Sequence, residues 1–338
     1  MTVLKDANIL VTGGTGSFGN AFVAQMLRQH GPRRIVIFSR DEMKQWEMAR
    51  RFDGESRVRF FVGDVRDRAR LARAMDGIDY VIHAAALKIV PTAEYNPFEA
   101  VKTNINGAMN VIDAALDKGV KRVVALSTDK ASSPVNLYGA TKLVSDKLFI
   151  AGNSYAGGHD TRFAVVRYGN VMGSRGSVIP HFLSLGASGR LPITDPGMTR
   201  FMVTLEQGVE LACHALLDTE GGEIYVRKIP SMRLADIARA VCPEAEIDVV
   251  GIRPGEKMHE QMISAEDAAH TYAYDGYYKI LPAIAPWGHA SRIKDGVKVP
   301  DGFSYASDTN DAWMSVGELR AWVEANRAAL TSGPRIAA

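Results

Sequence analysis

The stretch Thr12-Gly13-Gly14-Thr15-Gly16-Ser17-Phe18-Gly19 decides the fold of this chain. An apolar run, Asn8 to Thr12, leads into it and predicts a buried strand, and a helical pattern from Asn20 to Gln29 follows it. A strand, a glycine turn and a helix in this order are typical of a unit that binds a dinucleotide. A glycine turn without a ligand is the alternative interpretation.

The glycines of this stretch have separate functions in such a unit. Gly13 permits a tight turn, Gly16 lets backbone N–H groups approach a pyrophosphate, and Gly19 lets the helix pack closely on the strand. The N-terminus of the helix then stabilises the phosphates. We predict that Thr15, Ser17 and Phe18 also contact the cofactor.

Similar apolar runs alternate with helical patterns along the first half of the chain. They predict strands at 34–38, 58–62, 80–83, 122–127 and 161–167, and helices at 97–117, 203–217 and 316–327. Repeated strand-then-helix units predict an α/β fold with a doubly wound, Rossmann-like parallel sheet and helices on both faces.

The second half of the chain is less regular and rich in turn residues. We predict a cofactor-binding domain at 1–170, a smaller lobe at 171–330 that mainly binds substrate, and a tail at 331–338. The helix within 200–217 is expected to pack back on the first domain.

Composition excludes several classes of protein. The 338 residues carry 40 basic and 38 acidic side chains, a net charge of +2, which argues against a nucleic-acid partner bound through bulk charge. Two cysteines make no disulfide framework and favour a reducing compartment. The first apolar run is too short for a signal sequence or a membrane span, so we expect a cytoplasmic protein without a membrane partner.

The end of the second predicted strand favours NADP over NAD. An NAD enzyme usually has an acidic residue here for the ribose 2′-hydroxyl, whereas this chain has Ser39 followed by Arg40. A guanidinium pairs with a 2′-phosphate through a planar fork, and Lys44 adds charge. Asp41 leaves the alternative open, because it can neutralise Arg40 or accept from a ribose hydroxyl.

Further candidates follow the next two strands. Asp64 caps the following helix or contacts adenine, and we place Val65 beside it. The small residues Ala84 to Ala86 let the backbone lie close to a flat ligand. Lys88, after them, is a cofactor or substrate contact or a solvated lysine.

Two polar residues near these strands are expected to serve the fold. His83 is interpreted as a hydrogen-bonded core histidine. Asn104, inside a predicted helix, either braces the backbone near the active site or lies on the surface.

The chemistry is expected between Ser127 and Lys142. Tyr138 and Lys142 are spaced i, i+4 and share one helix face. A phenol has a pKa of about 10. A nearby ammonium and an oxidised nicotinamide lower that pKa, so that Tyr138 can take a hydroxyl proton as hydride leaves the same carbon. A surface helix pair is the alternative.

The glycine stretch and Tyr138-Gly139-Ala140-Thr141-Lys142 resemble those of the extended short-chain dehydrogenase/reductases. More narrowly, the chain resembles the inverting UDP-N-acetylglucosamine 4,6-dehydratases of pseudaminic acid biosynthesis. That likeness rests on five stretches: 38–42, 83–88, 127–130, 167–171 and 253–260. It implies an NADP-dependent hydro-lyase that acts on UDP-N-acetylglucosamine, with inversion at C5, and a tendency to form homo-oligomers.

The pair Asp129-Lys130 distinguishes this subfamily, since dehydratases that retain the C5 configuration commonly carry Thr-Asp-Glu at this place. Oxidation at C4 makes the C5 proton acidic, and a base removes it while an acid helps the C6 hydroxyl leave as water. Neutral Lys130 is a plausible base if burial and Lys142 lower its pKa, and once protonated it can serve as an acid. The division of roles with Asp129 stays open, and Thr128 is added to the catalytic group.

The resemblance also implies substrate contacts. Lys88 and Asn170 are expected at the sugar, and Arg253 and Glu256 at the UDP portion, with the alternative that each is a surface residue. Thr199, Arg200 and Val178 are further candidates for the substrate, and Val171 for the cofactor. No metal ligand is predicted.

Two rival functions remain. A nucleotide-sugar 4-epimerase or reductase of the same fold has no need for an acid–base pair at C5 and C6. A non-enzymatic NADP-binding regulator predicts no turnover with any sugar nucleotide.

Overall fold

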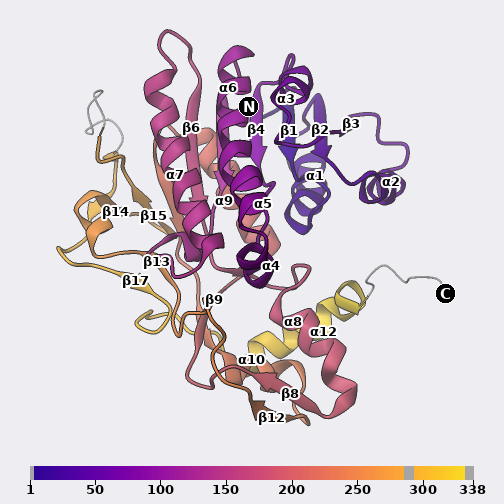
Figure 1. The fold of residues 1–338 in the computed structure, drawn as a ribbon, viewed down its shortest axis with the longest axis vertical. Coiled ribbons are helices and arrows are strands. Elements are labelled where there is room, and N and C mark those ends of the chain that lie inside the picture. The colour runs from indigo at the N-terminus through magenta and orange to yellow at the C-terminus, as the bar shows by residue number, and fades with distance from the viewer. Residues whose placement is uncertain (1–3, 285–292, 332–338) are drawn as a thin grey trace.

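A ten-stranded sheet forms the centre of the computed structural model, which describes residues 4–284 and 293–331 (Figure 1). Its strand order is β16-β14-β15-β10-β6-β5-β4-β1-β2-β3. The strands from β10 to β3 in this order run parallel, and they are β1 (Asn8–Thr12), β2 (Arg34–Ser39), β3 (Val58–Val62), β4 (Tyr80–His83), β5 (Arg122–Leu126), β6 (Arg162–Arg167) and β10 (Ile224–Arg227). The predicted α/β fold with a doubly wound parallel sheet is confirmed.

An antiparallel extension continues the sheet beyond β10. It consists of β15 (Tyr277–Ile280), β14 (Thr271–Ala273) and β16 (Val297–Lys298). These strands are not predicted from the sequence, because runs of two to four residues within a turn-rich segment are too short to carry a periodic signal.

Helices cover both faces of the sheet (Figure 1). On one face α3, α6 and α7 pack side by side, and on the other α1 packs against α9. The helices of this part are α1 (Ser17–Gln29), α2 (Glu42–Arg51), α3 (Arg68–Ala74), α4 (Val90–Tyr95), α5 (Pro97–Val101), η1 (Lys102–Asn106), α6 (Gly107–Asp117), η2 (Asp129–Ala131), α7 (Leu137–Tyr155) and α9 (Leu205–Asp218). Within the described residues, no helix is long and apolar enough to cross a membrane.

The predicted helix at 97–117 contains a π-helical turn, η1, between α5 and α6. Asn104 lies in this turn and is 1% exposed. Its side-chain oxygen accepts from the N–H of Leu87 at 2.8 Å, and its amide donates to the Leu87 carbonyl and to Thr141. The bracing role is therefore confirmed, and the surface alternative is wrong.

The predicted helix at 203–217 begins two residues too early. Residues 199–203 form strand β9 (Thr199–Val203), in which Val203 pairs with Val171. Helix α9 starts after Thr204, whose hydroxyl accepts from the N–H of Gln207 while the Gln207 side chain accepts from the Thr204 N–H. This reciprocal cap fixes the boundary.

A second core lies beneath the sheet in the view of Figure 1. It is built from buried side chains such as Phe182, Leu191, Met202, Ile237 and Leu319. Its elements are β7 (Asn170–Val171), α8 (Val178–Leu185), η3 (Gly186–Ser188), β8 (Arg190–Ile193), β9, β11 (Ser231–Arg233), α10 (Leu234–Val241), β12 (Glu246–Val249) and α12 (Val316–Thr331).

Short elements connect this lobe to the sheet: β13 (Gln261–Ile263), η4 (Glu266–His270) and β17 (Tyr305–Ala306). The tail predicted at 331–338 begins at the last residue of α12 and otherwise lies outside the described residues.

Candidate active site

A cavity of about 850 Å³ lies at the carboxyl ends of the parallel strands. Its walls come from the segments that follow β1 to β6 and from the loops at 174–177 and 253. This edge of an open α/β sheet is where ligands bind. The predicted site residues that line it are Gly13, Thr15, Gly16, Ser17, Phe18, Ser39, Arg40, Asp41, Lys44, Asp64, Val65, Ala84, Ala86, Lys88, Thr128, Asp129, Lys130, Tyr138, Lys142, Asn170, Val171 and Arg253.

The glycine stretch forms a cradle that side chains would fill. Gly13 has a φ of +63°, and a Cβ there would lie 2.8 Å from the backbone of Ala85. Gly16 is the N-cap of α1 and offers no side chain to the free N–H groups of the first turn. Gly19 does not line the cavity; a Cβ there would overlap the Gly14 carbonyl, so it sets the close packing of α1 on the turn. The cradle fits the pyrophosphate of a dinucleotide.

The end of β2 presents two cations and one paired carboxylate. Asp41 caps α2 by accepting from the Lys44 N–H at 3.0 Å, and the Lys44 Nζ lies 2.9 Å from its other oxygen. These hydrogen bonds lower the pKa of Asp41. The Arg40 side chain is 57% exposed and lies 3.8 Å from Asp64 instead. Asp41 therefore neutralises Lys44 rather than Arg40.

Asp64 is not the cap of the following helix. That position belongs to Asp67, which accepts from the Arg70 N–H, and α3 begins at the next residue. Asp64 binds the Arg66 side chain at 2.7 Å and lines the cavity. The interpretation of Asp64 as a helix cap is wrong, and its carboxylate lies on the cavity wall near the residues expected to bind the cofactor.

His83 is buried and lies with its Nδ1 2.8 Å from the Thr12 hydroxyl. Burial, with a smaller effect of Lys142, lowers its pKa to about 3. It is a neutral core histidine, as predicted.

Tyr138 and Lys142 lie in the first turns of α7, both buried and both on the cavity wall. The helix is fixed there by Asn136, whose side-chain oxygen accepts from the Gly139 N–H at 2.8 Å. The Asn136 amide also donates to the Gly255 carbonyl at 2.7 Å, so the loop around Arg253 docks on the start of α7.

The pKa of Tyr138 differs from the sequence-based expectation. Burial raises it to about 12, although the Lys130 ammonium and a hydrogen bond with Thr128 lower it. Burial lowers the pKa of Lys142, with Asp146 opposing the shift. Among the protein's own ammonium groups, that of Lys130 has the larger effect on this phenol, and the lowering by Lys142 together with an oxidised nicotinamide stays a prediction.

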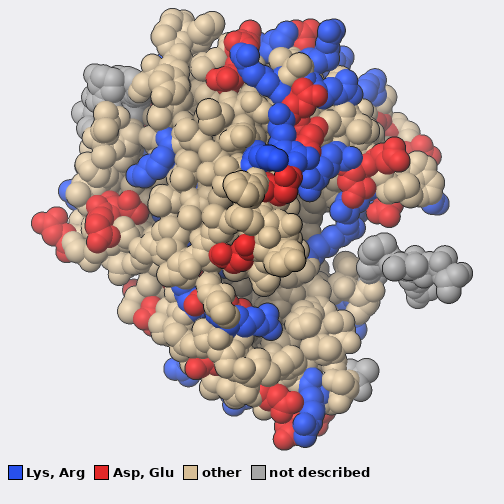
Figure 2. All heavy atoms as spheres, viewed as in Figure 1, with Lys and Arg blue, Asp and Glu red and all other residues tan. Residues whose placement is uncertain are grey.

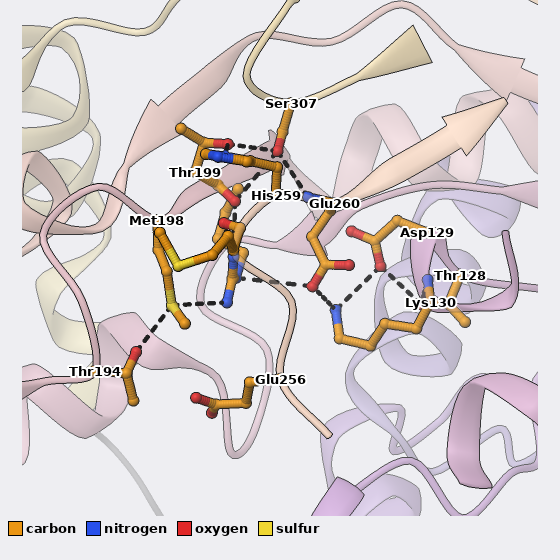
Figure 3. A network of polar contacts seen from close by, with 12 residues as sticks. Thr128, Asp129, Lys130, Thr194, Met198, Thr199, Glu256, His259, Glu260 and Ser307 are labelled. Atoms are coloured by element: carbon orange, nitrogen blue, oxygen red, sulfur yellow. Dashed lines mark hydrogen bonds and ion pairs between the residues drawn. The ribbon is translucent and has the colours of Figure 1, made fainter. Parts of the chain in front are cut away.

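Asp129 and Lys130 form a cluster with a third residue, Glu260, in which both carboxylates are buried and Lys130 is partly buried (Figure 3). The Lys130 Nζ lies 3.1 Å from Asp129 Oδ1 and 2.9 Å from Glu260 Oε1. Burial by itself lowers the pKa of Lys130, but the two carboxylates outweigh it and the pKa is raised. The condition for a neutral Lys130, a lowered pKa, is therefore not met in the protein itself, and the raised pKa favours the ammonium form.

Asp129 is fully buried, and burial raises its pKa despite Lys130. Its Oδ1 accepts from Thr128 and Lys130, whereas its Oδ2 has no hydrogen-bond partner. A carboxylate with one free oxygen and a raised pKa is suited to accept a proton.

Glu260 lies in the stretch 253–260, on which the family resemblance partly rests, but no role was predicted for it. No spacing rule connects it to Lys130, since the two are far apart in the chain. Because Asp129 alone balances the charge of Lys130, no feature of the sequence predicted a second carboxylate partner.

Four predicted substrate residues do not line the cavity. Thr199 is buried, with its hydroxyl 2.9 Å from His259 Nδ1 and 2.6 Å from Ser307 Oγ. Arg200 donates to the carbonyls of Thr199 and Met258, and its Nε lies 3.8 Å from Glu260. Both therefore lie behind Glu260.

The other two are Val178 and Glu256. Val178 packs against the second core, at the start of α8. Glu256 accepts from the Arg253 N–H at 3.4 Å, and its side chain lies apart from the cluster (Figure 3).

A family model described as polysaccharide biosynthesis protein matches residues 9–282. The chain belongs to this family. It is also 53% identical over 320 residues to the UDP-N-acetylglucosamine 4,6-dehydratase (inverting) of Campylobacter jejuni, covering 92% of this chain and 96% of that protein. A UDP-glucose 4-epimerase of Rickettsia akari is 43% identical over 301 residues, covering 87% of this chain and 88% of that protein.

Two solved structures extend the likeness. Pen from Bacillus thuringiensis has a TM-score of 0.88 and 36% identity, covering 96% of this chain and 99% of that chain. DesIV, a dTDP-glucose 4,6-dehydratase from Streptomyces venezuelae with NAD and TYD bound, has a TM-score of 0.68 and 25% identity, covering 74% and 86%. These findings confirm an extended short-chain dehydrogenase/reductase and an enzyme of the hydro-lyase class, and they support a nicotinamide cofactor.

Proposed function

We propose that the chain catalyses the NADP-dependent dehydration of UDP-N-acetylglucosamine, with inversion at C5, to UDP-2-acetamido-2,6-dideoxy-β-L-arabino-hex-4-ulose. One observation carries the proposal: a Tyr138–Lys142 pair and the Asp129–Lys130 cluster line the same cavity. The first pair serves redox chemistry at C4, and the second serves proton transfer at C5 and C6. The name and 53% identity of the Campylobacter relative support the same reaction.

The cradle at Gly13 and Gly16 would hold the pyrophosphate of the cofactor, and Ser39, Arg40 and Lys44 its adenosine end. A nicotinamide bound there supplies the oxidant for C4 and the reductant for C6. Lys142 and the backbone around Ala84 to Ala86 would hold the nicotinamide half beside Tyr138.

Each polar side chain of the cluster has a distinct proposed role. Tyr138 accepts the C4 hydroxyl proton as a phenolate, which requires that the cation of a bound oxidised nicotinamide lower its raised pKa, and Thr128 holds its hydroxyl group. Asp129 takes the C5 proton at its free Oδ2, because burial makes this carboxylate a stronger base, and passes it to the C6 hydroxyl, which leaves as water. Lys130, already an ammonium ion, is the acid that returns a proton to C5.

Substrate contacts are proposed for the cavity-lining residues Lys88, Asn170 and Arg253. Lys88 donates to the Arg175 carbonyl at 3.2 Å and so meets the glycine-rich loop at 174–177. Arg253 suits the diphosphate because a guanidinium fork matches phosphate oxygens.

The proposal is tested by incubation with UDP-N-acetylglucosamine and NADP⁺ in deuterated water. We expect a product lighter by one water, apart from the deuterium gained, with deuterium at C5 and the inverted configuration by NMR. A product of unchanged sugar-nucleotide mass contradicts the dehydration. Deuterium at C5 without inversion contradicts only the stereochemical part.

A 4-epimerase is the second candidate, favoured by the relative from Rickettsia. It predicts an isomer of the substrate in the same incubation. The Asp129–Lys130–Glu260 cluster favours the dehydratase, since epimerisation at C4 requires no acid and base at C5 and C6.

The choice of NADP leads to a prediction at Arg40. Replacing Arg40 with leucine removes an exposed guanidinium at the adenosine edge, so we expect affinity for NADP to fall about 10- to 100-fold, as for the loss of one charged hydrogen bond. Affinity for NAD should change little. Cofactor titration by fluorescence measures both. Arg34→Leu, at the other end of β2, is the control, and an equal loss for NAD and NADP would contradict the assignment.

The domain organisation and the oligomeric state are also part of the proposal. We propose that 1–170 is the cofactor-binding domain and that 171–330 mainly binds substrate, with α9 packed on the first domain. We also propose a homo-oligomer: Tyr95, Phe98, Met109 and Val144 are exposed on α4 to α7, and Figure 2 shows the surface over α7 largely without charged side chains.

The cellular compartment and the pathway are proposed from the chemistry of the thiols and of the product. Cys213 and Cys242 are free thiols, which supports a reducing cytoplasm. The product, a 4-keto-6-deoxy sugar nucleotide, suits the first step towards pseudaminic acid.

A further inference from the structure

Glu260 reaches the active site from a distant part of the chain. It precedes β13, whereas Lys130 lies in η2 directly after β5. The Glu260 side chain is 2% exposed and does not line the cavity, whereas Lys130 does. Figure 3 shows the two side chains extending towards each other, with Asp129 on the other side of the Lys130 Nζ.

The backbone of Glu260 is locked in place. Its N–H donates to Ser307 Oγ at 2.9 Å, and its carbonyl accepts from the Ser307 N–H at 2.8 Å. Ser307 Oγ is held in turn by Thr199 at 2.6 Å. A carboxylate carried on so fixed a backbone can hold its partner in one position.

The charges of the cluster are balanced for one protonation state of Lys130. Glu260 Oε1 binds the Lys130 Nζ at 2.9 Å and lies 3.8 Å from Arg200 Nε, while Glu260 Oε2 has no hydrogen-bond partner. Two buried carboxylates beside one amine would repel each other if that amine were neutral. A buried ion pair adds little to stability, because desolvation of the two charges cancels much of their Coulombic attraction. Stability alone therefore does not account for this pair.

We propose that Glu260 is a positioning residue, which holds Lys130 as an ammonium ion against the cavity wall and so keeps it ready to protonate C5. The inference rests on the proposed function and deepens it. In the step concerned, an N–H bond of Lys130 breaks and a C–H bond forms at the enolate carbon C5. Lys130 is left as a neutral amine between two carboxylates, and it regains a proton from water.

The charged and titratable groups around Lys130 favour this assignment. Asp129 and Glu260 raise the pKa of Lys130, whereas burial and Arg200 lower it. The groups that interact with the Lys130–Glu260 pair are Asp129 on η2, Tyr138 on α7, Arg200 on β9, Lys88 after β4 and Lys257 before β13. Of these, only Asp129 supplies a second carboxylate, so removal of Glu260 leaves Lys130 with one.

The test compares E260Q, E260D and the control E266Q, which removes an exposed carboxylate from the same part of the chain. For E260Q we expect kcat to fall about 10- to 100-fold with KM changed less than about twofold, at the low end of general acid–base effects. The alkaline limb of the kcat profile should move to lower pH by about one unit. Labelling of Lys130 by an amine-reactive reagent should become about tenfold faster, as expected for one pKa unit.

E260D keeps the charge but withdraws it by one methylene, so its kcat should fall between those of E260Q and wild type. It also carries the test if E260Q does not fold. A kcat of E260Q or E260D equal to that of wild type overturns the inference. So does a loss of kcat with unchanged Lys130 labelling and an unmoved alkaline limb, which would make Glu260 merely structural. Failure of the wild type to release water would instead contradict the proposed function.

Discussion

Replacing Tyr138 with phenylalanine is expected to lower kcat by about 10²- to 10⁴-fold, the range of a lost general acid–base group. The change deletes one oxygen from a buried side chain that lines the cavity beside Thr128, so the fold and cofactor binding should be retained. Turnover of UDP-N-acetylglucosamine measures the effect.

The control for this variant is Tyr155→Phe, at the exposed end of the same helix. Because Tyr138 acts at C4, in the oxidation that precedes elimination, no reduced nicotinamide should accumulate in a single turnover of Tyr138→Phe. Turnover within about threefold of wild type would remove Tyr138 from the mechanism.

Replacing Lys130 with methionine is expected to have the second large effect. The cation between Asp129 and Glu260 is lost, and kcat should fall about 10²- to 10⁴-fold. The base for oxidation at C4 is Tyr138, and Lys130 only helps to lower the pKa of that phenol, so oxidation should slow less than the later steps and absorbance of the reduced nicotinamide should still appear in a single turnover. That signal distinguishes this variant from Tyr138→Phe and assigns Lys130 to the later steps.

Lys130→Met should also lower the free energy of unfolding at neutral pH by about 3–5 kcal/mol, the usual cost of removing one partner from a buried ion pair. Without the ammonium, the pKa of Asp129, which burial already raises, rises further, and the pKa of Glu260, which Lys130 and Arg200 hold below its usual value, rises as well, so both carboxylates are protonated at a higher pH in the folded variant than in the folded wild type. Their protonation then favours the folded state, so the deficit should shrink as the pH falls through this range. Urea unfolding of wild type and variant, at neutral pH and at a lower pH, measures this difference in the free energy of unfolding.

Lys147→Met, an exposed lysine on α7, is the control for this change. A deficit that is the same at both pH values would contradict the account of the cluster. Wild-type turnover in Lys130→Met would contradict the proposed acid.

Local sequence determined the fold and the redox half of the site. The strand, glycine turn and helix around Gly13 to Gly19 are consecutive in the chain, and Tyr138 and Lys142 are one helical turn apart. Periodicity and spacing report such neighbours directly. The same local signals predicted β1 to β6 to within one residue at each end, and the helical stretch at 97–117 without its π-helical turn. They also predicted the helix at 203–217 except for its start, which the cap at Thr204 sets.

The tertiary structure decided the ionisation of the site. From the sequence, Lys130 had Asp129 and Lys142 as its known charged neighbours, and burial argued for a neutral amine. In the fold, the backbone contacts with Ser307 hold Glu260 within 2.9 Å of the Lys130 Nζ, and the side chain becomes an ammonium ion. Thr199 and Arg200, assigned to the substrate from the sequence, lie behind Glu260 for the same reason.

The physical cause of this division is the distance along the chain between the residues that interact. Backbone conformation and side-chain spacing are set by neighbours in the chain, so the sequence alone determined that this protein has a dinucleotide cradle and a tyrosine–lysine pair. The charge on a buried group depends on which distant charges the fold brings within a few ångströms. Only the tertiary structure could therefore show that Lys130 has two carboxylate partners, which raise its pKa and favour its ammonium form.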